Sequence, residues 1–241
     1  NKVVTTLDVT GNPSSIHRAG RESRQIIEKS REELATTVNA DTSSIIFTSG
    51  ATEANNLVIN TFEKIIASRM EHESILERNN IKYVDVTADG YVNMESLEKA
   101  AKDTINKNKT LISIMFANNE TGIIQPIKEI NKIAKKNNIL FHTDAVQAMG
   151  RVLIDFKDLE CDFLTISSHK IGGPKGAGAL LVKDKTALRY IKKWDIAVFR
   201  GGDKGVLHRT PDSALDGNSS IMMRLDDKSF LEGLKKFYGA A

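Results

Sequence analysis

Short runs of apolar and β-branched residues alternate along the chain with longer segments in which apolar residues recur every three or four positions. The longer segments have the periodicity of amphipathic helices, because residues at this spacing share one helix face. Helices are therefore expected over residues 18–38, 54–66, 94–105 and 127–136. The short runs are typical of strands, which are expected over residues 44–48, 81–86, 111–117, 139–143, 163–167 and 179–182.

The alternation of strands and helices indicates the fold class. Strands that are apolar throughout, such as residues 111–116, are typical of a sheet that helices cover on both faces. We therefore expect an α/β fold with a mostly parallel sheet flanked by helices. The regular pattern weakens after about residue 185, so residues 1–185 are expected to form one large domain and residues 186–241 a short C-terminal segment. That segment holds an apolar cluster, a turn at Gly201 and Gly202, and a short terminal helix.

Composition and charge narrow the class of protein. The 241 residues include 34 basic and 31 acidic side chains, for a net charge of +3, and 40% are hydrophobic. This balance is ordinary for a soluble globular protein, and the dispersed charges predict no nucleic-acid or membrane partner. No run reaches the ~18–20 consecutive apolar residues of a membrane helix. The first residues lack the apolar core and cleavage site of a secretory signal, so a cytoplasmic location is expected.

Cysteine and histidine positions argue against a metal site. The single cysteine, Cys161, excludes an intrachain disulfide and a multi-cysteine site, and is expected to be a small buried packing residue. No two of the five histidines have the four-residue spacing of helical ligands. His72 and Glu73 begin like a zinc-protease motif, but Leu76 stands where the second histidine belongs. We therefore expect no metal.

Polar residues follow three of the expected strands, at the edge where parallel sheets collect ligands. Residues 49–53 join a strand to a helix N-terminus, which is either an anion site or an ordinary N-cap. Asp144 follows an apolar strand, and either faces a cation or strong donor or caps the next helix. Lys170 precedes a glycine turn, and is either a desolvated amine with a lowered pKa or an exposed loop lysine.

Together the three positions point to one cofactor. Pyridoxal phosphate needs donors for its phosphate, an acid opposite its pyridinium nitrogen and a lysine that binds its aldehyde. An anion cradle, a buried carboxylate and a loop lysine in one sheet meet these needs, although none of them selects the cofactor alone.

Five longer segments resemble a known family. In chain order they are GNPSSIHRAG, IIFTSGATEANNLVI, NNETGIIQPI, HTDAVQAMGRVLID and SSHKIGGPKGAGALLV. They closely resemble the cysteine desulfurases of the NifS/IscS type, within the class V aminotransferases of the fold type I pyridoxal-phosphate enzymes. The likeness covers residues 11–182, and it implies the large, cofactor-binding domain of that fold.

The resemblance implies a role for each matching residue. Lys170 would bind the cofactor covalently and move protons on the substrate, and Asp144 would pair with the pyridine nitrogen. His72 would stack on the ring and assist proton transfer. Asn119 and Gln147 would hydrogen-bond around the ring hydroxyl and the substrate carboxylate. The phosphate would be held by four residues near the sheet edge, namely Ala51, Thr52, Ser167 and His169.

The resemblance also implies an activity and its partners. The family removes sulfur from L-cysteine, leaving alanine and transferable sulfur for iron–sulfur clusters or thio-cofactors, and its members act as homodimers. The small C-terminal domain, which supplies the acceptor cysteine and a carboxylate-binding arginine, is largely missing from the pattern, and Cys161 does not match the acceptor's position. A sulfur-acceptor or scaffold protein is then expected as a partner. The alternatives are a lyase, transaminase or racemase that uses the same cofactor, and a non-catalytic dimerising remnant.

Overall fold

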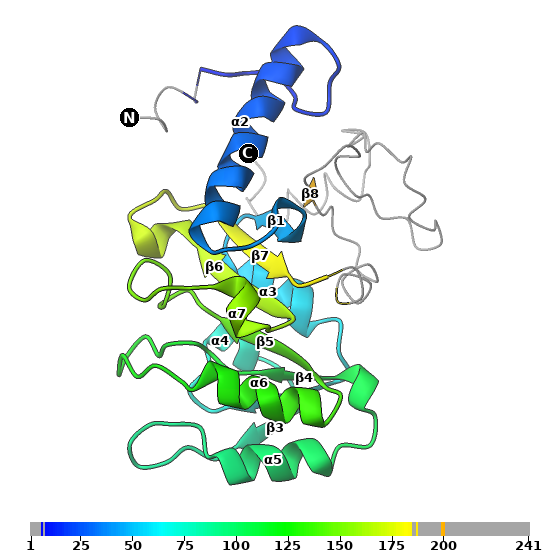
Figure 1. Cartoon of the computed structure of the whole chain (residues 1–241), viewed down its shortest axis with the longest axis vertical. Helices are drawn as coiled ribbons and strands as arrows, with labels where there is room; N and C mark the ends of the chain where they lie inside the picture. Colours follow the sequence, from blue (N-terminus) through cyan, green and yellow to red (C-terminus); the bar gives the residue numbers. More distant parts are fainter. Residues whose placement is uncertain (1–5, 7, 185–186, 188–198, 201–241) are drawn as a thin grey trace, which may run out of the picture.

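The structure is a computed structural model that describes residue 6, residues 8–184, residue 187 and residues 199–200. Within these residues one sheet runs through the molecule in the strand order β3-β2-β4-β5-β6-β7-β1-β8 (Figure 1). The strands are β1 (Ile45–Thr48), β2 (Lys64–Ser68), β3 (Ile81–Val84), β4 (Thr110–Ser113), β5 (Leu140–Asp144), β6 (Phe163–Ser167), β7 (Gly178–Val182) and β8 (Phe199–Arg200).

The sheet is mostly parallel, as the sequence predicts. Strands β3, β2, β4, β5 and β6 pair in parallel, whereas β7 is antiparallel to both of its neighbours, β6 and β1. Strand β1 therefore runs in the same direction as β6, although β7 separates them. The carboxyl ends of β1 to β6 consequently share one edge of the sheet.

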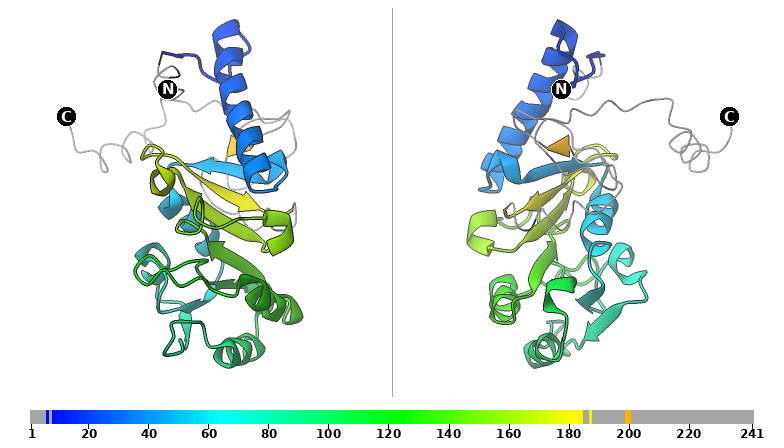
Figure 2. Two further views of the ribbon diagram at one scale, coloured as in Figure 1. Left: turned by 60° about the vertical axis from the view of Figure 1, so that its left-hand side comes forward. Right: turned by 90° about the vertical axis from the view of Figure 1, so that its right-hand side faces the viewer.

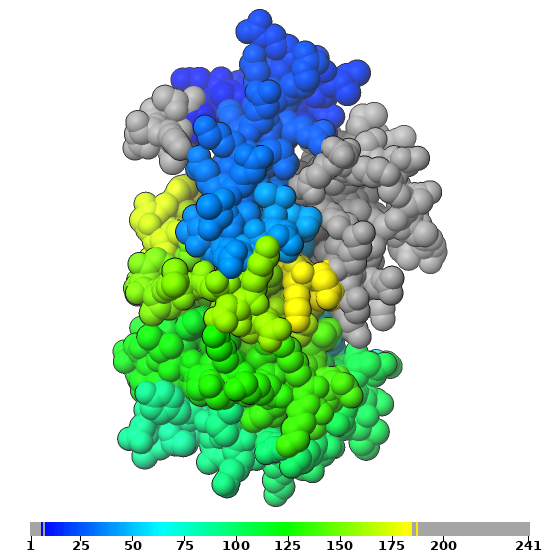
Figure 3. All heavy atoms as spheres, viewed as in Figure 1, coloured from blue at the N-terminus to red at the C-terminus, as the bar shows by residue number. Residues whose placement is uncertain are grey.

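Helices cover both faces, and each face has its own apolar core (Figure 2). The first face carries α5 (Met94–Lys102), α6 (Ile127–Lys136), α7 (Phe156–Leu159) and the end of α2 (Arg18–Thr37). The second face carries α3 (Ala51–Ile59) and α4 (Glu73–Leu76). Short 3₁₀ turns add η1 (Thr42–Ser44), η2 (Lys107–Lys109) and η3 (Ser168–Ile171). The first half of α2 extends beyond the sheet at one end of the molecule (Figure 3).

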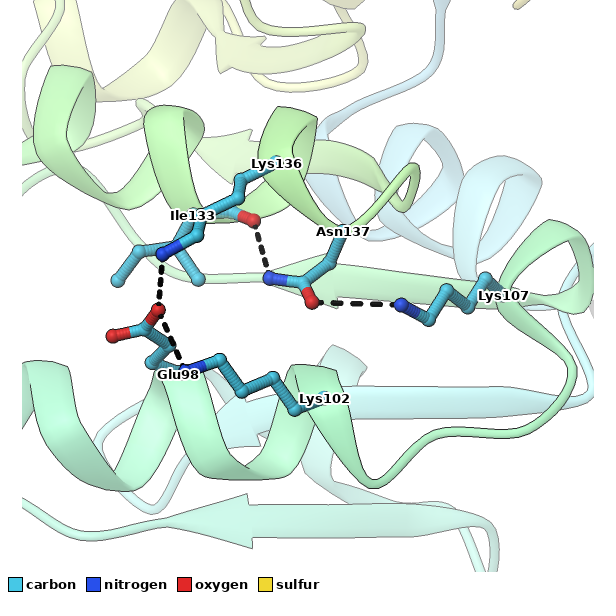
Figure 4. A network of polar contacts seen from close by, with 6 residues as sticks. All are labelled: Glu98, Lys102, Lys107, Ile133, Lys136 and Asn137. Atoms are coloured by element: carbon cyan, nitrogen blue, oxygen red, sulfur yellow. Dashed lines mark hydrogen bonds and ion pairs between the residues drawn. The ribbon is translucent and has the colours of Figure 1, made fainter.

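Helices α5 and α6 lie side by side, and charged groups connect their outer surfaces (Figure 4). The Glu98 carboxylate on α5 is 2.7 Å from Lys136 Nζ on α6 and 3.1 Å from Lys102 Nζ on its own helix. Lys107 donates to the Asn137 side chain at the end of α6. The two lysines lower the pKa of Glu98, because they stabilise its charged form.

One expected helix is partly wrong, and the other expected helices and strands differ from the observed ones mainly at their ends. The helix expected over residues 54–66 ends at Ile59, and Lys64–Ser68 forms strand β2 instead. Residues 65–67 are fully buried, and a short apolar run of this kind fits a covered strand as well as a buried helix. Strand β4 is shorter than expected, whereas β6 and α6 have the expected bounds.

Most of the expected C-terminal segment lies outside the described residues. This applies to its apolar cluster, the glycine turn at Gly201 and Gly202, and the terminal helix. Among the described residues, the helices are too short or too polar to traverse a lipid bilayer.

Candidate active site

The alternation of side chains along the strands selects which residues face α3 and α4. On β5 and β6 the residues on this face are His142, Asp144, Phe163, Thr165 and Ser167, since Phe163 belongs to the α3 core and the pattern repeats every second residue. Polar side chains thus lie towards the carboxyl ends of these strands, beside the first turn of α3. The same edge receives the loops after β1, β2 and β4.

Asp144 is a buried carboxylate held by neutral donors. It is 6% exposed, and its Oδ2 accepts from Asn55 Nδ2 at 2.8 Å while Oδ1 accepts from the Val146 amide at 3.0 Å. Burial raises the pKa of Asp144, and the bonds from Asn55 and Val146 and the nearby His72 oppose that rise. In the described part of the chain, no basic side chain forms an ion pair with it. Asn55 is the expected strong donor, and the bond from the Val146 amide, two residues on, is the alternative capping contact, so both expected arrangements are present.

Asn55 is a site residue that the sequence reasoning missed. It lies on the buried face of α3, and its Nδ2 contacts both Asp144 and Ser74 Oγ, the latter at 3.0 Å. Its Oδ1 is buried without a hydrogen-bond partner. A polar residue among Ala54, Leu57 and Val58 on the apolar face of a helix was the available signal.

His72 connects to the same network from the other side. It caps α4, with Nδ1 accepting from the Ser74 amide at 3.1 Å and lying 2.9 Å from Ser74 Oγ. Hydrogen bonds thus run from Asp144 through Asn55 and Ser74 to the exposed His72 ring. These hydrogen bonds occupy Nδ1 of the His72 ring, so Nε2 is the ring nitrogen that can contact a ligand.

A buried histidine lies on the same strand as Asp144. His142 Nδ1 is 2.9 Å from Ser113 Oγ on β4, and Nε2 is 3.0 Å from Thr165 Oγ1 on β6. Burial lowers the pKa of His142 to about 3, so the ring is neutral at physiological pH. The bridge joins the adjacent strands β4, β5 and β6 two residues before Asp144.

The turn between β1 and α3 forms an open cradle. Gly50 begins the helix without a side-chain cap, and Thr52 is exposed in its first turn, so N–H groups of that turn remain for a ligand. The Glu53 carboxylate already accepts from the Ser49 amide and the Ser49 hydroxyl, both at 2.6 Å. Gly178 pairs with both Thr48 and Ser167, and a Cβ at Gly178 would lie 2.8 Å from Gly50 Cα. The lack of a side chain there allows the Gly50 turn to approach the end of β6.

The end of β6 carries the remaining polar groups of the cradle. Ser167 Oγ is 2.8 Å from His169 Nδ1, and Lys170 follows on the single turn η3. Lys170 is exposed, which fits the exposed loop lysine of the two alternatives rather than the desolvated amine, because it lies on a short turn that the Gly172 turn follows. Ala51 and Thr52 at the start of α3 and Ser167 and His169 at the end of β6 thus lie on either side of Gly178, and their role towards a phosphate stays a prediction.

Asn119 and Gln147 lie on loops at the same edge. The Asn118 side chain accepts from the backbone amides of Glu120 and Thr121, at 2.9 and 2.8 Å, which turns the loop and leaves Asn119 exposed. Gln147 is half-buried three residues after Asp144. Within the described residues, neither side-chain amide forms a hydrogen bond, so both amides can bind a ligand.

Two further expectations from the sequence concern Cys161 and metal binding. Cys161 is fully buried just before β6, and burial raises the pKa of its thiol, which confirms the expected packing role. The described residues contain no group of three histidine, cysteine or acidic side chains able to hold a metal ion.

The comparisons with known proteins agree with this geometry. The family profile "Aminotransferase class-V" matches residues 4–201. "Cysteine desulfurase IscS" of Dictyoglomus turgidum is 46% identical over 195 residues, which cover 74% of this chain and 48% of that protein. The X-ray structure of a NifS-like protein from Rickettsia africae is 42% identical with a TM-score of 0.72, covering 75% of this chain and 53% of that one. The solved structure "SspA in complex with cysteine" is 34% identical with a TM-score of 0.68, covering 76% and 58%.

The chain spans about half the length of the curated relatives that it matches. The match nevertheless includes every strand from β1 to β8 and all of the polar residues at the sheet edge. The chain belongs to the aminotransferase class-V family, whose members, the cysteine desulfurases among them, depend on pyridoxal phosphate.

Proposed function

We propose that this protein binds pyridoxal phosphate at the described sheet edge and acts in the removal of sulfur from L-cysteine, which leaves alanine. The observation that carries the proposal is the buried Asp144 carboxylate, which has amide donors and no cation among the described residues. Asp144 would therefore pair with the protonated pyridine nitrogen of the cofactor. The solved relative described with bound cysteine supports the choice of substrate.

The residues present fit the cofactor. The open cradle around Gly50 offers backbone N–H groups, Thr52 and Ser167 for a phosphate, since a helix N-terminus favours an anion. The bound cofactor would supply an electron-withdrawing ring that weakens the bonds at the substrate Cα. Asp144, held in place by Asn55 and the Val146 amide, would keep the ring nitrogen protonated.

The remaining side chains orient the substrate and move its protons. The Lys170 Nζ would take and return the proton at the substrate Cα. His72 would hold a proton at Nε2, because Ser74 already occupies Nδ1. The amides of Asn119 and Gln147 would bind the ring hydroxyl and the substrate carboxylate.

The sulfur acceptor has to be a thiol outside these 241 residues. The only cysteine in them is Cys161, which is buried and whose pKa is raised, so it is not an accessible thiolate. The balanced reaction is cysteine plus an acceptor thiol giving alanine plus an acceptor persulfide. We propose that an acceptor protein supplies the thiol and that the sulfur serves iron–sulfur clusters or thio-cofactors.

The first experiment mixes the purified chain with pyridoxal phosphate, records the visible spectrum, reduces with borohydride and maps the modified lysine. Modification at Lys170 supports the proposal, and absence of a covalently bound cofactor contradicts it. Cysteine with dithiothreitol as acceptor thiol is then added, and alanine and sulfide are measured. Turnover of another amino acid without sulfide would instead assign the site to a transaminase or lyase.

We also propose a homodimer and a cytoplasmic location. Light scattering on the purified chain tests the dimer, and a monomer mass with bound cofactor contradicts it. The single cysteine fits a reducing compartment. Cell fractionation tests the location, because one relative, from Candida maltosa, is named a mitochondrial cysteine desulfurase.

A further inference from the structure

A second buried carboxyl lies next to the candidate site and has no part in the roles described above. Glu71 is on the turn between β2 and α4, directly before His72, and is 5% exposed. Its Oε1 accepts from Ser68 Oγ at 2.6 Å, and its Oε2 is buried without a hydrogen-bond partner. A buried acid with an unpartnered oxygen is costly when it is ionised.

The turn that carries Glu71 is fastened to the loop after β4. Asn118 Nδ2 donates to the Met70 carbonyl at 3.2 Å, and the Met70 amide donates to Ser68 Oγ at 3.3 Å. The Met115 backbone hydrogen-bonds to Glu71. Glu71 thus sits where the ends of β2 and β4 meet, and its position sets where His72 begins α4.

Burial and the nearby Asp144 favour the neutral form of Glu71, whereas its two hydrogen-bonding neighbours favour the charged form. Ser68 on β2 and the Met115 backbone after β4 are the hydrogen-bonding neighbours, and Asp144 on β5 is the charged group that acts on it. In the described part of the chain no basic side chain pairs with Glu71. Burial, with a smaller contribution from Asp144, raises the pKa of Glu71 to about 8, although Ser68 and Met115 oppose the rise.

We propose that Glu71 is a positioning residue whose neutral carboxyl clamps the 68–72 turn, and that loss of its proton releases the clamp and the placement of His72. Ionisation would put negative charge on a buried carboxyl whose Oε2 has no hydrogen-bond partner among the described residues, so the turn would open to bring water to that oxygen. The candidate site would then be ordered while Glu71 keeps its proton and less ordered once it is lost.

The cofactor measurement rests on the proposed function. Pyridoxal phosphate is titrated into wild type and Glu71→Gln at one pH unit below and one above 8. Glutamine keeps an acceptor for Ser68 and cannot ionise. If only the protonated form is competent, the ratio of the wild-type dissociation constant to that of Glu71→Gln rises about tenfold between the two pH values. A constant ratio overturns the proposal.

Two further variants separate the clamp from a general effect of mutation. Glu71→Ala removes the carboxyl and should weaken cofactor binding at both pH values, whereas Glu71→Gln should bind like wild type at the lower pH and more tightly than wild type at the higher one. Glu63→Gln is the matched control, because the Glu63 side chain is exposed and, among the described residues, pairs with Lys109 alone, at 2.6 Å. Equal binding by the alanine and glutamine variants would contradict the positioning role.

A measurement without cofactor distinguishes failure of the clamp from failure of the proposed function. The folded protein holds the Glu71 proton more tightly than the unfolded chain does, so wild-type stability should fall as pH rises from about 4.3 towards 8. The difference in Tm between wild type and Glu71→Gln should therefore change over this window and level off above it. A difference independent of pH overturns the clamp, even if no variant binds pyridoxal phosphate.

Discussion

Acidic side chains have opposite environments in two regions of the molecule, the outer layer formed by α5 and α6 and the carboxyl edge of the sheet. Glu98 on α5 is solvated and has two lysine partners, which lower its pKa. Asp144 and Glu71 at the sheet edge are buried without a described cationic partner, and their pKa values are raised. The charge of Glu98 is balanced by lysines of the same layer. The carboxyls at the sheet edge have no such partner and are neutralised only by a bound proton or by a cationic ligand.

This difference teaches where function is located in the fold. A buried carboxyl that lowers stability when it is ionised is commonly found at a functional site, where it serves ligand binding or catalysis. Exposed ion pairs contribute little and can be exchanged. The comparison therefore predicts that substitutions at the edge alter ligand binding strongly, while substitutions in the outer layer alter only stability, and weakly.

The largest expected effect comes from comparing two exposed lysines. Lys170→Ala should abolish the covalently bound cofactor entirely, because no neighbouring amine lies on the η3 turn, whereas Lys136→Ala on α6 should leave it unchanged. Borohydride reduction followed by peptide mapping measures both. Label retained in the Lys170 variant, at Lys175 for example, would show that the edge does not select this lysine.

The next largest effect is expected for Asp144→Asn, which should lower the affinity for the cofactor but raise the Tm of the cofactor-free protein. Asp144→Asn removes the counter-charge of the ring nitrogen, and loss of one member of a buried charged pair costs 2 kcal/mol or more, so affinity should fall at least about thirtyfold. Burial raises the folded pKa of Asp144, so the folded protein loses stability as pH rises above the unfolded value of about 3.9. The cofactor-free variant should therefore have a higher Tm than wild type at neutral pH.

Calorimetry without cofactor and a spectroscopic titration test the two halves separately. A lower Tm for the Asp144 variant would mean that its bonds with Asn55 and Val146 outweigh the cost of its burial. Unchanged affinity would remove Asp144 from the ring-nitrogen role.

The sequence predicts the edge better than its supporting contacts. Strand–helix alternation and the polar residues at strand ends locate Asp144 and Lys170, because both signals are local. Asn55 and Glu71 are missed because their roles depend on neighbours far away in the chain, Asp144 for Asn55 and Met115 for Glu71. Strand β2 was expected to be helical for a different reason. Its short run of buried apolar residues has no period that distinguishes a covered strand from a helix.

A smaller effect is expected at Asn55. Asn55→Ala leaves Asp144 Oδ2 without its side-chain donor, which should raise the pKa of Asp144 further and weaken cofactor binding by about 5- to 150-fold, as loss of a buried hydrogen bond to a charge costs ~1–3 kcal/mol. The loss should be larger at acidic pH, where Asp144 would more readily be neutral. Asn60→Ala, at the far end of α3, is the control. Equal effects of the two variants would indicate a helix defect rather than a contact with Asp144.

The smallest effect is expected in the outer layer, and it completes the comparison. Glu98→Gln removes the ion pairs to Lys102 and Lys136, but all three groups are solvated, so Tm should fall by at most about two degrees. Because the folded pKa of Glu98 is lowered, this contribution is present above the unfolded value near 4.3 and is lost as pH falls through the folded value. Melting curves at low and high salt measure it, since screening should abolish the difference. A large fall in Tm that persists in high salt would show that the outer layer, like the sheet edge, depends on its charges for more than solvation.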